Sequence, residues 1–140
     1  MAVTHQAHNI SISIESDVGE VYDFASRPEN FPRWATGLAE SIQAEGDHWV
    51  ATTPEGEIRV RFTPPNDYGV LDHHATLPTG TEVYVPMRVV ANEAGSEVIF
   101  TLFRTTGMTD EILARDMEWV RRDLGVLKEL LETRADSAGE

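Results

Sequence analysis

The apolar positions near the carboxyl end of the chain recur at steps of three and four residues. They are Leu113, Met117, Val120, Leu124, Leu127 and Leu131. This spacing places them on one stripe of an α-helix, which we expect to run from about Thr109 to Thr133. An apolar stripe must be covered, and the segments ahead of this helix are its available partner.

Those earlier segments alternate between apolar and polar residues, as half-buried strands do. A first strand is expected over residues 8–15, where isoleucines alternate with serines. Two short helical segments follow: the first begins at the capping pair Asp17 and Glu20, and prolines 28 and 32 bound the second. The alternation beyond them predicts six further strands, over 38–44, 48–53, 57–63, 69–77, 82–91 and 97–104.

These elements predict an α+β protein. Because each link between consecutive strands is too short for a crossover, we expect a curved, seven-stranded antiparallel sheet wrapped around the C-terminal helix. A strongly bent sheet and a straight helix cannot stay in contact along their whole length, so a cavity is expected between them, closed at one end by the two short helices. The 140 residues suit one domain, with a core from about 8 to 132 and a polar tail at 134–140.

The order of strand, two helices, six strands and long helix resembles the helix-grip architecture of the SRPBCC superfamily. This superfamily includes START-like, pollen-allergen-like and polyketide cyclase/dehydrase-like proteins. The resemblance rests on Val-Tyr-Asp-Phe at 21–24, Pro-Glu-Asn-Phe-Pro-Arg-Trp at 28–34, Leu-Asp-His at 71–73, Tyr-Val-Pro-Met-Arg-Val-Val at 84–90 and Phe-Thr-Leu-Phe at 100–103. It implies the fold and the position of the cavity. It implies no catalytic residue, because the superfamily ranges from lipid carriers and hormone receptors to cyclases and dehydratases.

Composition excludes several classes of function. With 24 acidic and 11 basic residues the net charge is −13, so a phosphate backbone would be repelled and nucleic acid is not an expected partner. No apolar run reaches the roughly 18 residues of a membrane span, and the polar start without a leader favours a cytoplasmic protein. There is no cysteine and no serine-hydrolase, zincin, dinucleotide or P-loop motif, so we expect neither a metal nor another cofactor.

The strongest candidate for chemistry is His73. It shares the apolar phase of its strand with Leu71 and Ala75, so it should point inward, where an imidazole could act as acid or base. The alternative is a hydrogen-bonded histidine in the core or at its rim. His74 points to the opposite face, so the two histidines cannot chelate one metal ion from a regular strand.

A catalytic His73 would need a second polar group to orient it. Tyr84 and Arg88, on the following strand, are the nearest candidates, and an inward Arg88 with Tyr84 could also clamp a ligand carboxylate or carbonyl. They face inward only if Pro86 changes the phase of that strand, since proline in a strand marks an edge or a bulge.

The expected cavity lining combines apolar residues from the short helices, the strands and the long helix. It comprises Phe31, Trp34, Leu71, His73, Val85, Met87, Phe100 and Met117. The aromatic members could stack on a ligand or simply fill the core.

Three classes of function remain open. The first is a carrier or sensor that binds a small hydrophobic or amphipathic molecule in the internal cavity. The second is a polyketide cyclase/dehydratase-like enzyme with a cavity acid or base. The third is a homo-oligomeric interaction module, because residues 98–103 are apolar on both faces, which predicts either full burial or the interface of a homodimer. We favour the binding function over an enzymatic one, because the sequence does not show an acid, a base and an orienting group together.

Overall fold

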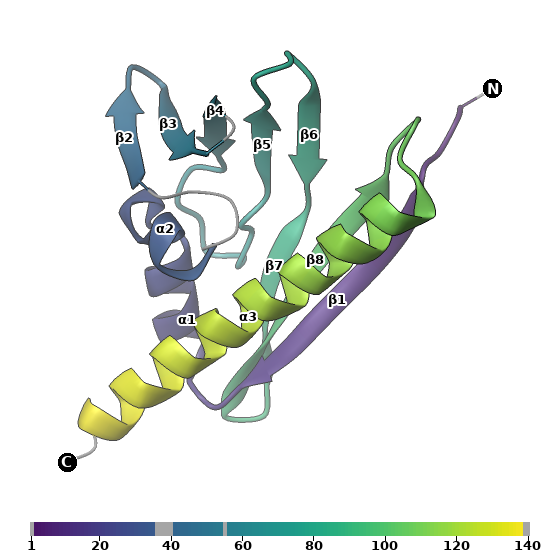
Figure 1. Cartoon of the computed structure of the whole chain (residues 1–140). Helices are drawn as coiled ribbons and strands as arrows, with labels where there is room; N and C mark the ends of the chain where they lie inside the picture. The colour runs from purple at the N-terminus through teal and green to yellow at the C-terminus, as the bar shows by residue number, and fades with distance from the viewer. Residues whose placement is uncertain (1, 36–40, 55, 139–140) are drawn as a thin grey trace.

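A long helix, α3 (Asp110–Ala138), lies across antiparallel strands in the computed structural model (Figure 1). The structure describes residues 2–35, 41–54 and 56–138, without the side chains of 135–138. The chain begins with β1 (Gln6–Ile14), α1 (Val18–Ala25), a 3₁₀ turn η1 (Pro28–Asn30) and α2 (Phe31–Trp34). The later strands are β2 (Ser41–Glu45), β3 (His48–Thr53), β4 (Gly56–Phe62), β5 (His73–Thr76), β6 (Glu82–Val85), β7 (Met87–Asn92) and β8 (Gly95–Arg104).

Local chemistry accounts for the short helices. The Asp17 carboxylate accepts a hydrogen bond from the backbone N–H of Glu20 at 2.9 Å, which caps the first turn of α1 as the sequence predicts. Pro28 occupies the first turn of η1, where its missing N–H costs no hydrogen bond. The Asp17 cap and Pro28 thus define where the short helical segments begin after β1.

The strands form two sheets, so the predicted single seven-stranded sheet is wrong. One sheet has the order β1-β8-β7 and the other the order β2-β3-β4-β5-β6. Every strand pair is antiparallel, as predicted. The predicted strand at 82–91 is divided at Pro86 into β6, which pairs with β5, and β7, which pairs with β8.

The division at Pro86 has a hydrogen-bonding cause. Proline has no N–H to donate to a neighbouring strand. The next N–H, that of Met87, is taken by the carboxylate of Asp72 at 2.8 Å, while the carbonyl of Pro86 accepts from Thr101 N–H at 2.9 Å. The backbone therefore changes partners here, and of the predicted strand at 69–77 only β5 is regular, with Val70 forming an isolated bridge to Arg88.

Two other boundaries differ from the prediction. Helix α3 continues to Ala138, beyond the predicted end at Thr133, so residues 134–138 of the predicted polar tail are helical. Neither glycine nor proline occurs between Thr133 and Gly139, so the local sequence offers no reason for an earlier end. The predicted strand at 38–44 lies outside the described residues over 38–40, as do residues 139–140 of the predicted tail.

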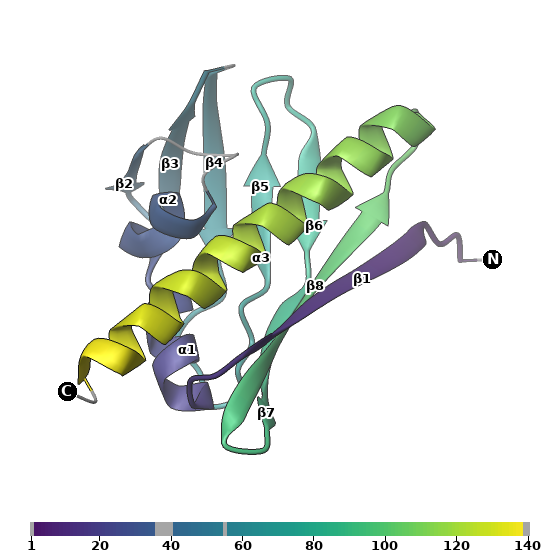
Figure 2. The same ribbon diagram turned by 60° about the horizontal axis from the view of Figure 1, so that its bottom comes forward.

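The core is concentrated where the carboxyl-terminal half of α3 meets β1 and the short helices. Leu124, Leu127 and Leu131 are fully buried there, whereas Met117 and Val120, nearer the start of α3, are only partly buried. Figures 1 and 2 show the same arrangement, with the late turns of α3 beside α1 and its first turns beside the end of β8. Among the described helices, none combines the length and apolar character that crossing a membrane requires.

Candidate functional site

His73 lies on the inner face of β5, within a group of aromatic rings. It is 5% exposed, and its ring centroid lies 5.9 Å from that of Phe31 and 5.7 Å from that of Phe62. On its two neighbouring strands, Phe62 and Val85 are its register partners, so all three side chains face the same side of the sheet. Strand alternation thus carries the imidazole into the interior.

The hydrogen bonding of His73 fixes its tautomer. Its Nδ1 lies 3.1 Å from the carbonyl oxygen of Leu71, and because a carbonyl only accepts, Nδ1 carries the hydrogen. Burial lowers the pKa of His73 and outweighs the Leu71 carbonyl and the nearby Asp72 carboxylate, which act in the opposite direction. The ring is therefore neutral near pH 7, with Nε2 as a hydrogen-bond acceptor.

A cavity of about 10 Å³ adjoins His73 at the corner between α1, α2 and the ends of β4 and β5. Its lining comprises Ala25, Ser26, Trp34, Phe62, Thr63, Leu71, His73 and Met87. This volume is about that needed by one water-sized group. The predicted residues Trp34, Leu71, His73 and Met87 are thus brought together, around a space far smaller than a ligand chamber.

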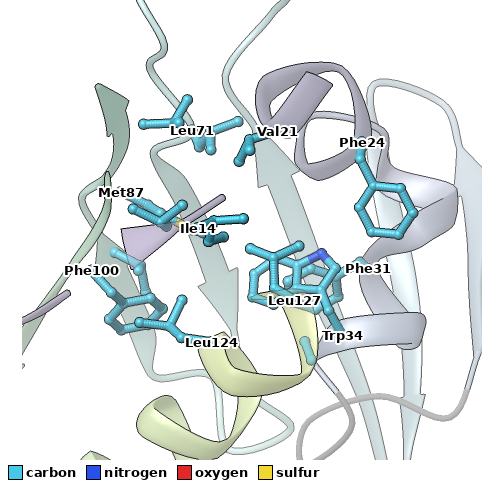
Figure 3. Close-up of a cluster of buried hydrophobic side chains, with 14 of the residues drawn as sticks. Ile14, Val21, Phe24, Phe31, Trp34, Leu71, Met87, Phe100, Leu124 and Leu127 are labelled. Atoms are coloured by element: carbon cyan, nitrogen blue, oxygen red, sulfur yellow. The ribbon is translucent and has the colours of Figure 1, made fainter. Parts of the chain in front are cut away.

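Trp34 contributes an unsatisfied donor to this corner. The residue is 4% exposed, and among the described residues its buried Nε1–H finds no hydrogen-bond acceptor. Figure 3 shows the indole beside Phe31 and Leu127, with its nitrogen on the edge turned toward the interior of the cluster. A buried donor without an acceptor costs about 1–3 kcal/mol and calls for an explanation.

The other residues predicted to line the cavity do not line this space, although Phe31 and Val85 adjoin His73. Phe31, Val85 and Phe100 are buried in the core, and Met117 is partly buried on α3. Sequence reasoning missed the contributions of Ala25, Ser26, Phe62 and Thr63. The sequence pattern could have indicated Phe62, because it shares the apolar phase of its strand with Ile58 and Val60. The close approach of the end of α1 to the end of β4 leaves no signal in the sequence.

Tyr84 and Arg88 face away from His73. They contact Asp72 on the outer side of the sheet: Nη2 of Arg88 lies 2.9 Å and the Tyr84 hydroxyl 3.3 Å from Oδ2 of Asp72. Burial raises the pKa of Asp72, but hydrogen bonds from Arg88 and from Met87 N–H outweigh it and hold that pKa below its usual value. Alternation persists across Pro86, so the change of phase that would bring Tyr84 and Arg88 to His73 does not occur.

The inner face of the five-stranded sheet continues outward from His73 and is apolar. Val60 and Ala51 are buried, but other inner-face side chains are only partly buried, and on the first half of α3 Leu113 is buried whereas Met117 and Val120 are partly buried. The partly buried side chains include Ile42, Trp49, Ile58, Phe62, Ala75, Val83, Met117 and Val120. In the described part of the chain, no three His, Asp or Glu side chains are grouped to hold a metal ion.

Comparison with known proteins gives a likeness of fold. No family model matches the chain, and no curated protein matches it in sequence. Among solved structures, XoxI from Bacillus cereus is 16% identical, with a TM-score of 0.71 over 89% of this chain and 94% of that one. The Aha1 dimer from Colwellia psychrerythraea is 18% identical, with a TM-score of 0.69 over 91% of this chain and 96% of that one.

A third solved structure, DynU16, is described as a putative protein in the dynemicin biosynthetic locus. It is 16% identical, with a TM-score of 0.69 over 91% of this chain and 47% of that one. These structures confirm the helix-grip fold that the sequence predicts. At such low identities the likeness concerns the fold alone.

Proposed function

We propose that this helix-grip protein binds a small apolar or amphipathic molecule on the inner face of β2–β6, beside the first half of α3. The observation that carries the proposal is the partial burial of apolar side chains that point inward, such as Ile58, Val83 and Met117. Inward apolar side chains in a filled core are fully buried, as Leu124 and Leu127 are.

The chemistry of this face suits an apolar ligand. Covering it would gain about 25 cal/mol for each Å² of apolar surface removed from water. Arg59 and Arg61 alternate with its apolar residues and are exposed on the opposite face, so they would not meet the ligand.

Binding of the neutral dye Nile red, whose emission rises in apolar surroundings, tests the proposal. Ala75→Phe places a ring on the half-buried inner face between Val60 and Val83, and should weaken dye binding at least tenfold. Thr76→Phe, one residue along β5 and directed to the other face, is the matched control and should bind as wild type does. Equal binding by the two variants, or none by wild type, would remove the proposal.

An enzyme of the cyclase or dehydratase class has less support. His73 is inward and oriented by the Leu71 carbonyl, but the cavity beside it admits only a water-sized group, and Tyr84 and Arg88 lie on the other face. A catalytic acid or base must lie within hydrogen-bond distance of the substrate, whatever its pKa, and a cavity of this size does not admit a substrate next to His73.

Self-association is a second candidate with its own observation. On the outer face, Tyr84 and Val90 are each 43% exposed, and the ring of Tyr84 stacks on Phe103 at 6.3 Å. Exposed apolar side chains on an outer sheet face are candidates for a subunit contact. Sedimentation of wild type and Val90→Glu at several concentrations tests it: a dimer lost in the variant supports the outer face as the contact, and a monomeric wild type excludes it.

A further inference from the structure

The small cavity is lined by Trp34 and His73, whose rings carry a donor and an acceptor without a partner in the described chain. The donor is the Nε1–H of Trp34, which is buried and has no acceptor among the described residues. The acceptor is Nε2 of His73: the ring lines the same cavity, and its Nδ1 hydrogen is committed to the Leu71 carbonyl. Within the described chain, no side chain or backbone group donates to Nε2.

The cavity lies at one end of the proposed binding face. Phe62, His73 and Met87 line it from the sheets, and Phe62 and His73 belong to the same inner face as Val60 and Ala75, nearer the half-buried region. A ligand lying along that face can therefore place one end in the cavity. The volume of about 10 Å³ limits that end to a water-sized group.

We propose that Trp34 and His73 together recognise a hydroxyl group, so that the ligand is an amphipathic alcohol or phenol. The inference rests on the proposed binding function and narrows it to a ligand class. A hydroxyl oxygen accepts from the indole N–H while its hydrogen is donated to the imidazole Nε2. A hydroxyl group is small enough for the cavity and satisfies both atoms at once.

Other polar ends fit less well. A carboxylate is larger than the cavity, and both of its oxygens only accept, so Nε2 of His73 would face a negative charge without a hydrogen between them. A fluorine atom matches the size of a hydroxyl but cannot donate. Because a buried donor without an acceptor is costly, the site should discriminate against ends that leave the Trp34 N–H unpaired, and a hydroxyl gains a second hydrogen bond by donating to Nε2 of His73.

Displacement of Nile red by three eight-carbon probes tests the inference. They are 1-octanol, 1-fluorooctane and octanoate. Trp34→Phe removes the donor and keeps a ring in place, so it should weaken 1-octanol about tenfold and leave 1-fluorooctane within twofold. Comparing each ligand across the same substitution cancels the difference in the hydrophobicity of the two probes. Octanoate should bind the wild-type protein at least tenfold more weakly than 1-octanol.

A matched control is the other tryptophan on the inner face, Trp49, which is half-buried and lies outside the cavity lining. Trp49→Phe should change the affinities for 1-octanol and 1-fluorooctane alike. His73→Phe removes the acceptor and should reproduce the selective loss of 1-octanol, which keeps the test decisive if Trp34→Phe fails to fold by circular dichroism.

The outcomes separate this inference from the proposed function. If the wild-type protein binds neither dye nor probes, the binding function itself fails. If the probes bind, but Trp34→Phe and His73→Phe weaken the binding of 1-octanol and 1-fluorooctane equally or weaken neither, the two side chains do not recognise a hydroxyl group. Octanoate binding as tightly as 1-octanol would also overturn the inference.

Discussion

Removal of the Asp72 carboxylate should destabilise the protein, because this group holds the junction between the two sheets. In the folded chain it accepts hydrogen bonds from Met87 N–H at 2.8 Å, Arg88 Nε at 3.1 Å and Arg88 Nη2 at 2.9 Å. In Asp72→Ala the N–H of Met87, a residue only 1% exposed, loses its acceptor at a point where Pro86 already interrupts the ladder.

The size of the effect follows from two contributions. A buried N–H left without an acceptor costs about 1–3 kcal/mol. The ion pair adds about 0–1 kcal/mol, since the Arg88 side chain is 47% exposed even though that of Asp72 is only 15% exposed. Together they predict a loss of about 1–4 kcal/mol in the free energy of unfolding.

The measurement is urea unfolding followed by far-ultraviolet circular dichroism, with Asp23→Ala as the matched control. Asp23 also pairs with an arginine, Arg27, at 3.2 Å, but both side chains are more than half exposed. That variant should lose no more than about 0.5 kcal/mol. If the two variants differ by less than 0.5 kcal/mol, the carboxylate of Asp72 does not hold the junction.

The same comparison has a pH dependence of known sign. Because the folded-state pKa of Asp72 lies below its unfolded value, the stabilisation from its charge is complete above the unfolded pKa and is lost as pH falls through the folded pKa. The difference between wild type and Asp72→Ala should therefore be constant from about pH 7 to pH 5 and shrink below about pH 4. A difference that grows on acidification would contradict the assigned ion pair.

Two further substitutions test the packing. Leu124→Ala, at a residue of α3 that is 1% exposed, should lower the free energy of unfolding in urea by about 2–5 kcal/mol. The control Glu129→Ala, at an exposed position of the same helix, should lower it by less than about 0.5 kcal/mol. A loss below about 0.5 kcal/mol for Leu124→Ala would mean that α3 does not pack as described. Gly69→Ala should lower the melting temperature more than Gly80→Ala, although both glycines have positive φ. A Cβ added to Gly69 would lie 2.2 Å from the carbonyl oxygen of Val89, whereas no described atom lies within 4 Å of a Cβ added to Gly80. Equal melting temperatures would contradict the close approach of residue 69 to β7.

Local periodicity was enough to predict most elements of the fold. The stripe of leucines on α3, the alternation in β1 and β3, and the capping pair at Asp17 each depend on residues near one another in the chain, so the sequence displays them directly. The inward direction of His73 follows from the same alternation, because successive side chains of a strand point to opposite faces.

Tertiary structure decided the features that depend on distant residues. The two-sheet arrangement requires a hydrogen bond between Asp72 and Met87, fifteen positions apart, and nothing in the pattern around Pro86 reveals that acceptor. The size of the cavity depends on how Ser26 and Thr63 pack beside Trp34, and a periodic pattern gives the direction of a side chain without the volume left around it. The sequence by itself therefore determined the elements and the faces that they bury. Only the folded chain determined where the sheet divides and which polar atoms remain available to a ligand, because side-chain packing and long-range hydrogen bonds arise between segments that folding brings together.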